Sequence, residues 1–343
     1  MRTKLFTIRD ITIDQEKIIE ASKLLANGEL VAFPTETVYG LGADATNEAA
    51  VAGIFTAKGR PQDNPLIVHV ASEAQCRELV EKIPEYVNVL MEKFSPGPIT
   101  FVLPHKGGLA RNVTAGLTTV GVRIPDHPLA LALIEKSGCP IAAPSANTSG
   151  KPSPTQAWHV AADLDGQIAG IVDGGATGIG VESTVVDCTG EKPVILRPGG
   201  VTQEMIESVL GFELDQKKEM PEADKPKSPG MKYRHYAPEL PLWLVEGNTE
   251  SLQQLINDEQ KKGKRIAVLA RNEVANKLTA SSILNLGEQP EEIAACLYDA
   301  LRRYTKTDAD LLICEAFSKQ GIGEAIMNRL TKAADAYIVL DKN

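Results

Sequence analysis

The spacing of apolar residues divides the chain into two parts with different rhythms. Up to about residue 200, short apolar runs that are typical of buried strands alternate irregularly with helical patterns. The runs that predict strands are 30–33, 66–70, 99–103, 120–124, 141–143, 171–173, 183–187 and 194–196. The patterns that predict helices are 14–27, 47–57, 74–82, 128–137 and 154–164, the last two preceded by Asp126 or Ser153 with a proline near the first turn. This mixture predicts an α/β or α+β domain with a large mixed sheet.

A more regular order follows in the last third of the chain. Strand-like runs at 242–245, 266–269, 283–286, 311–315 and 337–340 are separated by helical stretches, including 291–304. Strands that alternate with helices predict a parallel sheet in a Rossmann-like layer architecture. The pair Gly321 and Gly323 lacks the remaining glycine of a dinucleotide fingerprint, so we expect a structural or docking role for it.

The segment between these parts, 215–232, reads DQKKEMPEADKPKSPGMK and has no aromatic or β-branched residue. It cannot bury enough apolar area to offset its ordering entropy, and this predicts a linker. A tether does not need the aromatic and basic residues that follow at 233–236, so we expect these to contact the active site. The predicted organisation is a first domain at 1–212, a linker that can supply an active-site lid at 213–238, and a second domain at 239–343.

Composition narrows the class of protein. With 343 residues, 43% of them hydrophobic, the chain is long enough for two cores. It has no apolar run of transmembrane length, and charges occur where a signal peptide needs its apolar stretch, so we expect a cytoplasmic protein with no membrane contact. The five cysteines lack any paired CxxC spacing, which argues against a disulfide framework and a structural zinc site. A net charge of −9 predicts that any contact with RNA is weak, local or mediated by a partner.

Two polar clusters in apolar surroundings suggest the chemistry, TAKGRPQDNP at 56–65 and APSANTSG at 143–150. In the first, Lys58 and Arg60 bring a compact point charge and a planar fork to a turn, a combination that suits a polyphosphate. A solvated turn after a helix is the alternative, but the buried strand that starts directly after this cluster favours a rigid loop. The second cluster supplies hydroxyl and amide donors. Together they predict an anion pocket.

Several blocks identify a family. In order and spacing the chain resembles the YrdC-like domain of threonylcarbamoyl-AMP synthases through FPTETVYGL (33–41), KGR (58–60), NPL (64–66), GVRIP (121–125), SAN (145–147), ESTVVD (182–187) and LRPG (196–199). A second resemblance, to the long, two-domain members, covers SPGMKYRHYAP at 228–238. The fold class implied is α/β, a YrdC-like mixed-sheet domain followed by a linker and a smaller Rossmann-like parallel α/β domain.

The resemblance implies a nucleotidyltransferase that makes threonylcarbamoyl-AMP and pyrophosphate from L-threonine, bicarbonate and ATP. A partner transferase would then pass the threonylcarbamoyl group to tRNA, next to the anticodon. Because the reaction couples a carbamate to the α-phosphate of ATP, positioning and charge neutralisation should dominate over acid–base work. Mg²⁺ would arrive with ATP and keep mostly phosphate and water ligands, so we predict no protein ligands for a metal.

The matching blocks also imply which residues bind the substrates. Lys58 and Arg60 are the expected catalytic residues. L-threonine would be held by Thr35, His69, Arg123 and Ser183. ATP would contact Lys58, Arg60, Gln62, Thr119, Ser145, Asn147, Ser153, Arg197, Arg234 and Tyr236, the last two closing over the pocket from the linker.

Some of these residues have structural alternatives. His69 lies in an apolar strand, where a core histidine bonded to backbone is the usual explanation. Arg123 must pair with an anion because its charge is too costly to bury alone, and that anion could be a substrate carboxylate or a structural Asp or Glu. The glycine-rich stretch 174–180 is either a long hairpin loop or a ligand clamp. The stretch 40–45 matches GxGxxA formally but lies too far past its strand for a dinucleotide site.

Two other functions compete with the adenylate synthase. The same basic pocket could hold a phosphodiester backbone in an RNA-binding module, which would show steep salt dependence and no pyrophosphate release. A carbamoyl-adenylate-forming factor of hydrogenase maturation uses a similar domain, but the absence of CxxC zinc motifs and of additional catalytic domains argues against it.

Overall fold

The computed structural model describes residues 2–214, 235–305 and 307–340. It divides into two compact units, one made of residues 1–149 and 153–232 and the other of residues 150–152 and 233–343. Most of the linker expected at 213–238 therefore lies outside the described residues, and the domain boundaries stay a prediction. None of the helices in the described ranges is long and apolar enough to cross a membrane.

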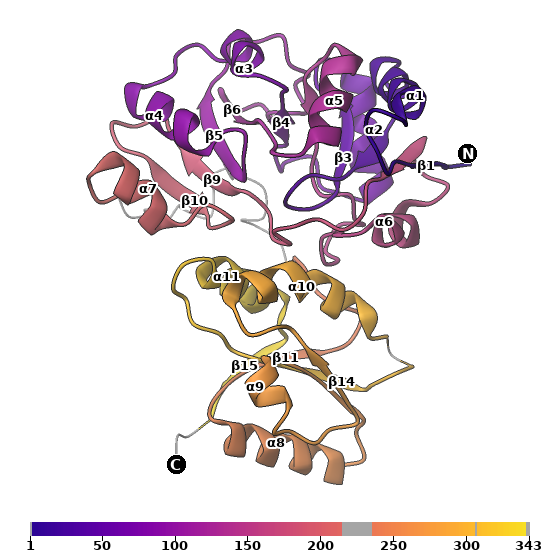
Figure 1. Ribbon diagram of the computed structural model, residues 1–343, viewed down its shortest axis with the longest axis vertical. Helices are drawn as coiled ribbons and strands as arrows, with labels where there is room; N and C mark the ends of the chain where they lie inside the picture. The colour runs from indigo at the N-terminus through magenta and orange to yellow at the C-terminus, as the bar shows by residue number, and fades with distance from the viewer. Residues whose placement is uncertain (1, 215–234, 306, 341–343) are drawn as a thin grey trace. The chain divides into compact units, whose positions relative to one another are not determined.

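The first unit is built on a mixed sheet, as predicted (Figure 1). In the described part of the chain its ten strands follow the order β1-β8-β2-β3-β7-β4-β6-β5-β9-β10, with parallel and antiparallel pairs. The strands are β1 Lys4–Thr7, β2 Val31–Phe33, β3 Gly40–Asp44, β4 Ile67–His69, β5 Ile99–Pro104, β6 Thr119–Arg123, β7 Ile141–Ala142, β8 Gly170–Asp173, β9 Thr184–Asp187 and β10 Val194–Arg197. The helices are α1 Gln15–Ala26, α2 Glu48–Lys58, α3 Glu73–Leu79, α4 Glu85–Phe94, α5 Pro128–Ser137, α6 Ala157–Leu164 and α7 Gln203–Leu210.

Helix α2 shows how the sequence fixes the elements near the anion pocket. Asn47 caps its start, because the side-chain oxygen of Asn47 accepts hydrogen bonds from the backbone N–H groups of Ala49 and Ala50. Gly59 ends it in the left-handed conformation, with φ of 59°, which glycine adopts without a Cβ penalty. The chain therefore turns directly after Lys58, and this turn sets the direction in which Arg60 leaves the helix.

The sequence did not predict β1, β3, α4 or α7. Strand β3 was missed because it contains Gly40 and Gly42, which weaken a strand pattern. A Cβ at Gly42 would lie 2.7 Å from the ring of Phe33, so glycine is needed there for the two strands to pack. The segment is thus a strand and not the strand-to-helix turn of a dinucleotide fingerprint.

The expected helix 154–164 is too long at its start. Helix α6 begins at Ala157, after Gln156. Ser153 does not cap it, because the Ser153 hydroxyl is 2.5 Å from Oε1 of Glu182 and donates a hydrogen bond to it. Tertiary contacts have overridden the local helix-start signal here.

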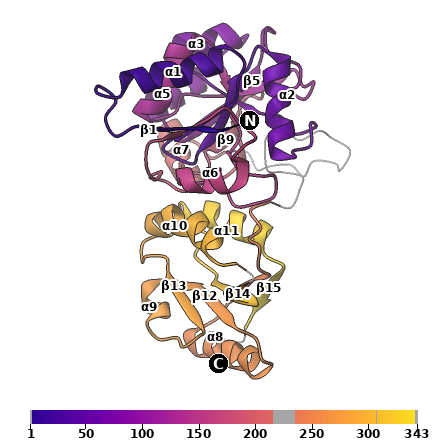
Figure 2. The ribbon, with the colours of Figure 1, turned by 90° about the vertical axis from the view of Figure 1, so that its right-hand side faces the viewer.

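The second unit confirms the expected parallel sheet. The described strands follow the order β13-β12-β14-β11-β15 with every pair parallel, and α8 and α9 cover one face while α10 and α11 cover the other (Figure 2). The strands are β11 Leu242–Glu246, β12 Ile266–Ala270, β13 Ser282–Asn285, β14 Leu311–Glu315 and β15 Ala336–Val339. The helices are α8 Thr249–Lys261, α9 Asn272–Ala275, α10 Pro290–Arg303 and α11 Gly323–Ala333.

Candidate active site

Sheet register brings two of the predicted threonine residues together. In the parallel pair of β4 and β6, His69 lies opposite Arg123 and Ile67 lies opposite Gly121. Residues that face each other across neighbouring strands point to the same side of the sheet. His69 and Arg123 are therefore neighbours on one face, although 54 positions separate them in the chain.

The floor of this face is apolar. Ile67, Val102, Val185 and Leu196 form a small buried cluster across β4, β5, β9 and β10. Gly121 lies opposite both Ile67 and Val102, and a Cβ there would come within 3.1 Å of the Thr100 methyl group. Polar groups around this floor are poorly solvated, so their charges and hydrogen bonds act more strongly than they would in water.

A hydrogen-bond network on the same face contains two more predicted residues. The hydroxyl of Ser183 lies 2.8 Å from that of Thr100. Arg197 donates from Nη2 to the carbonyl of Ser183 at 2.9 Å and to its hydroxyl at 3.2 Å. Ser183, expected to bind threonine, and Arg197, expected to bind phosphate, are thus in direct contact. The sequence did not point to Thr100, which is fully buried.

Arg123 has an acidic partner that the sequence left open. Its Nη2 lies 2.6 Å from Oε1 of Glu36, and its Nε donates to the carbonyl of Gly97 at 3.2 Å. The Arg123 side chain is 5% exposed and that of Glu36 is 11% exposed. The short contact lacks hydrogen-bond geometry, so within the described residues Nη2 and both Glu36 oxygens are buried without a hydrogen bond.

Burial disfavours the charged form of two histidines beside this pair. Burial, with help from the positive charge of Arg123, lowers the pKa of His69 to about 3. Burial also lowers the pKa of His127, against the opposing charges of Glu36 and Asp126. Among the described residues neither Nδ1 atom has a hydrogen-bond partner. Both rings offer an unpaired nitrogen to a polar ligand.

The loop that carries Glu36 is held from two sides. Thr35 is buried, and its hydroxyl donates to the carbonyl of Val38 at 2.7 Å. The glycine-rich stretch 174–180 packs its backbone on this loop, because the N–H of Ile179 donates to the carbonyl of Glu36 at 2.8 Å and that of Gly180 to the carbonyl of Thr37. The stretch therefore fixes the position of the Glu36 backbone.

The two polar clusters of the sequence meet at Lys58. This residue ends α2 and is only 2% exposed, so the solvated-turn alternative is wrong for it. Its ammonium group donates to the carbonyls of Ser145 and Asn147, the latter at 2.5 Å. The Ser145 hydroxyl donates in turn to the side-chain oxygen of Asn147. Arg60 is half-buried, and its Nη2 lies 3.4 Å from the carbonyl of Asn64.

The remaining predicted ATP residues are more scattered. Gln62 is exposed on the turn after α2, and Thr119 is half-buried on the same side of β6 as Arg123. Tyr236 belongs to the second unit, where its ring stacks on that of Tyr298 at 5.5 Å between centroids. Arg234 lies outside the described residues, so its role and that of Tyr236 toward ATP stay predictions.

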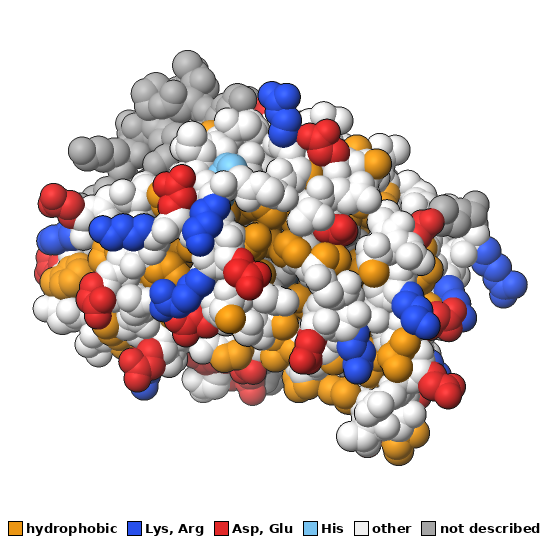
Figure 3. All heavy atoms as spheres, turned by 90° about the horizontal axis from the view of Figure 1, so that it is seen from above, with side chains coloured by type: hydrophobic (Ala, Val, Ile, Leu, Met, Phe, Trp, Pro, Cys, Tyr) orange, Lys and Arg blue, Asp and Glu red, His pale blue; other side chains and the backbone are white. Residues whose placement is uncertain are grey.

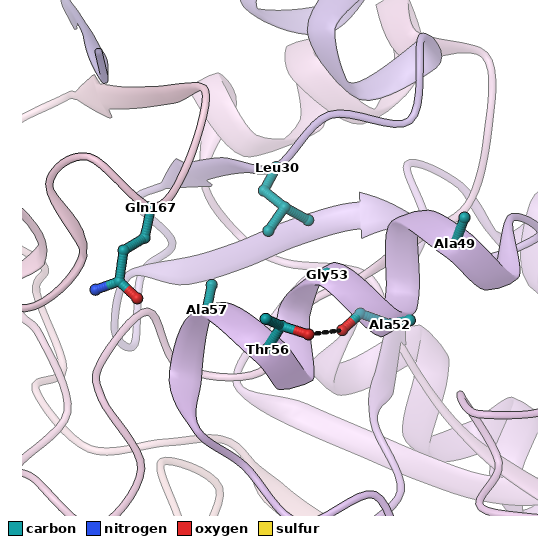
Figure 4. Close-up of a pocket in the computed structure, with 7 residues that line it drawn as sticks. All are labelled: Leu30, Ala49, Ala52, Gly53, Thr56, Ala57 and Gln167. Carbon is teal, nitrogen blue, oxygen red and sulfur yellow. Dashed lines mark hydrogen bonds between the residues drawn. The ribbon is translucent and has the colours of Figure 1, made fainter. Parts of the chain in front are cut away.

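A surface depression of about 620 Å³ lies along α2, and none of these predicted residues lines it (Figure 4). Its lining is mainly small and apolar, and its polar members are Thr56 and Gln167. Both are bonded within the protein, since the Thr56 hydroxyl donates to the carbonyl of Ala52 and the Gln167 amide to that of Asp163. The candidate active site is therefore assigned to the polar groups around Arg123 and around Lys58, and not to this depression.

Neither the face of the molecule seen in Figure 3 nor the metal-ligating side chains of the described residues indicate a second candidate site. In the view of Figure 3, basic and acidic side chains are interspersed and form no extended basic face. No group of three or more His, Cys, Asp or Glu side chains that could hold a metal ion occurs in the described ranges.

Comparisons with known proteins agree with the family resemblance. Residues 23–199 match the family model described as "Telomere recombination", which covers the Sua5, YciO and YrdC proteins, and residues 201–335 match the model described as "Threonylcarbamoyl-AMP synthase, C-terminal domain". The chain is similar to the threonylcarbamoyl-AMP synthase of Bacillus subtilis, with 53% identity over 99% of this chain and 100% of the relative.

A relative from Pyrococcus abyssi, also a threonylcarbamoyl-AMP synthase, is 47% identical over 98% of this chain and 99% of its own. The crystal structure of the P. abyssi Sua5 protein complexed with L-threonine superimposes with a TM-score of 0.93, at 47% identity, and covers 99% of this chain and 100% of that one. Similarity of this extent covers both units of the fold.

Proposed function

Since this chain belongs to the threonylcarbamoyl-AMP synthase family, and is therefore an enzyme that forms an adenylate with ATP, we propose that the reaction takes place in its first unit, on the sheet face that carries Arg123. The substrates are L-threonine, bicarbonate and ATP, and the products are threonylcarbamoyl-AMP and pyrophosphate. A downstream transferase uses the adenylate to modify tRNA next to the anticodon.

One observation carries the assignment of the threonine site. Around Arg123 the described residues place buried polar atoms without hydrogen-bond partners, belonging to Glu36, His69 and His127. Unpaired buried polar groups are costly, so a site that retains several of them is built for a polar ligand. We assign the carboxylate of L-threonine to Arg123 and its remaining polar groups to Thr35, His69 and Ser183.

The phosphates of ATP belong to the neighbouring cations. Lys58 and Arg60 flank the turn after α2, Arg197 is joined to Ser183, and Ser145 and Asn147 already bind the Lys58 ammonium group. Gln62, Thr119 and Ser153 complete the nucleotide contacts in this proposal. These cations stabilise the charge that develops as the carbamate attacks the α-phosphate.

The side chains assigned to ATP suit Mg²⁺ only when it is bound to the phosphates of ATP. The side chains assigned to the phosphates are cations, hydroxyls and amides, and no acidic cluster of the described residues forms a cage. Phosphate and water oxygens would then supply most of the ligands that Mg²⁺ prefers. Removal of Mg²⁺ by a chelator is expected to abolish turnover and to leave threonine binding intact.

A pyrophosphate-release assay on the full chain tests the proposed reaction. Turnover should require L-threonine, bicarbonate and ATP together, because the carbamate has to form before it attacks the nucleotide. Equal turnover with L-alanine, or with bicarbonate rigorously removed, would contradict the proposal. Binding of RNA with a steep salt dependence and no pyrophosphate release would favour an RNA-binding module instead.

A further inference from the structure

Glu36 is a buried carboxylate that the substrate assignments above do not use. It lies in the loop between β2 and β3, 2.6 Å from the guanidinium group of Arg123. Buried ion pairs offset their desolvation cost only with good geometry and additional hydrogen bonds. This pair has the distance of a salt bridge, yet within the described residues both Glu36 oxygens lack a hydrogen bond.

A zwitterionic amino acid would complete this arrangement. The carboxylate and the ammonium of an α-amino acid are attached to the same carbon, so the ligand presents opposite charges side by side. The pair of Arg123 and Glu36 presents the complementary charges at one contact. A ligand carboxylate on Arg123 would therefore bring its ammonium group next to Glu36, where it replaces the guanidinium as the cation beside that carboxylate.

We propose that Glu36 receives the α-ammonium group of L-threonine and takes its proton, so that the free amine can attack bicarbonate. This inference rests on the proposed assignment of the threonine carboxylate to Arg123. In the first step the N–H bond breaks and the proton moves to a Glu36 oxygen, leaving R–NH2 and a neutral carboxyl group. In the second step the amine nitrogen forms a C–N bond with the carbon of HCO3⁻, while one C–O bond of bicarbonate and one N–H bond of the amine break. The products are R–NH–COO⁻ and H2O, and Glu36 later returns its proton to water.

The surroundings favour Glu36 over the other bases nearby. The titratable groups around it are Arg123 from β6 and His127 at the start of α5, with His69 from β4 beside Arg123 and Asp126 next to His127. Both histidines are weaker bases than a free imidazole, because burial lowers their pKa values. When the ligand carboxylate takes over Arg123, transfer of the ammonium proton to Glu36 removes two opposite charges from a poorly solvated site.

The test compares two ligands on two proteins. Binding of L-threonine and of (2S,3R)-2,3-dihydroxybutanoate, which has a hydroxyl in place of the ammonium group, is measured by calorimetry without ATP or bicarbonate. The wild type should prefer threonine. Glu36→Gln should lose that preference, with threonine bound about 10-fold to 100-fold more weakly and the hydroxy acid bound about as well as before. Glu29→Gln, the same change at an exposed position, should bind both ligands like the wild type.

A pH profile tests the proton transfer. For Glu36→Gln, kcat/KM for threonine should fall about 10²-fold to 10⁴-fold at neutral pH. Part of this loss should be recovered as the pH rises and free threonine loses its own proton. Glu36→Asp, which keeps a carboxylate, should retain the preference for threonine and a pH profile like that of the wild type, and it serves also if Glu36→Gln does not fold.

The possible outcomes distinguish a failure of the Glu36 inference from a failure of the proposed threonine site. If Glu36→Gln weakens both ligands equally, Glu36 only positions Arg123, and the inference is wrong. If it changes neither ligand nor the pH profile, Glu36 does not contact the substrate at all. If Arg123→Gln leaves threonine affinity unchanged, the proposed threonine site itself is wrong.

Discussion

Two arginine–glutamate pairs, one in each unit, differ in how completely they are bonded. In the second unit Arg271 donates to Glu315 Oε1 from Nε at 2.9 Å and from Nη2 at 2.6 Å, and its backbone N–H donates to Oε2 at 3.0 Å. In the first unit the contact between Arg123 and Glu36 is equally short but makes no hydrogen bond. The pair of Arg271 and Glu315 therefore satisfies its own hydrogen bonds, whereas the pair of Arg123 and Glu36 does not.

The position of the complete pair makes the contrast informative. Glu315 ends β14 and Arg271 follows β12, so the pair lies at the carboxyl ends of neighbouring parallel strands. Open α/β sheets commonly bind ligands at that edge. Here the protein's own side chains satisfy each other there. A Rossmann-like architecture alone therefore does not identify a ligand site.

The largest difference between the two pairs should appear in turnover. Arg123→Gln removes the proposed anchor of the threonine carboxylate, and kcat/KM for threonine should fall about 10³-fold. Arg271→Gln should change it by about twofold or less, because Arg271 is occupied by Glu315. Pyrophosphate release is the measurement. Similar losses in the two variants would remove the distinction between the pairs.

Lys58→Met should sharpen the comparison by separating threonine binding from nucleotide chemistry. Methionine keeps the buried stem but removes the ammonium group, so turnover should fall about 10²-fold. Calorimetric affinity for threonine without ATP should stay near that of the wild type, unlike in Arg123→Gln. A normal rate would exclude Lys58 from the phosphate site.

For the free energy of unfolding, Arg271→Gln should cause the larger loss and Arg123→Gln the smaller one. Glu315 is 9% exposed, and Arg271→Gln would leave this carboxylate without its charged partner. The free energy of unfolding of the second unit should fall by about 1–2 kcal/mol, allowing for the partial exposure of Arg271. Arg123→Gln should destabilise the first unit less, since the contact between Arg123 and Glu36 makes no hydrogen bond. Unfolding followed in the two units separately by hydrogen exchange would detect this.

A further effect concerns acid stability. The pKa of His69 is lowered from 6.5 to about 3, so below pH 6.5 the unfolded chain takes up a proton that the folded chain refuses. Stability should decrease as the pH falls from 6.5 toward 3, by at most about 1.4 kcal/mol per pH unit for this one group. His69→Gln should flatten the dependence of Tm on pH in this range. An unchanged slope would mean that His69 is not held neutral.

The sequence predicted the sheets and named most residues of the candidate site, whose roles stay predictions, but it did not predict the contact between Arg123 and Glu36. Periodicity located β4 and β6, and their register then placed His69 beside Arg123. Glu36 was overlooked although it lies inside the recognised block FPTETVYGL, because its contact with Arg123 spans 87 positions and depends on how the loop folds. Two signals were available in the sequence. One is an acidic residue within a block of residues that carry hydroxyl groups, and the other is a strand arginine that needs an anion.

A crystal structure of this chain with L-threonine bound tests the central claim most directly. The claim is that the incompletely bonded pair of the first unit is the threonine site. The account predicts the ligand carboxylate within hydrogen-bond distance of Arg123, the ammonium group beside Glu36, and the pair of Arg271 and Glu315 unchanged. Threonine bound elsewhere, with the contact between Arg123 and Glu36 undisturbed, would contradict it.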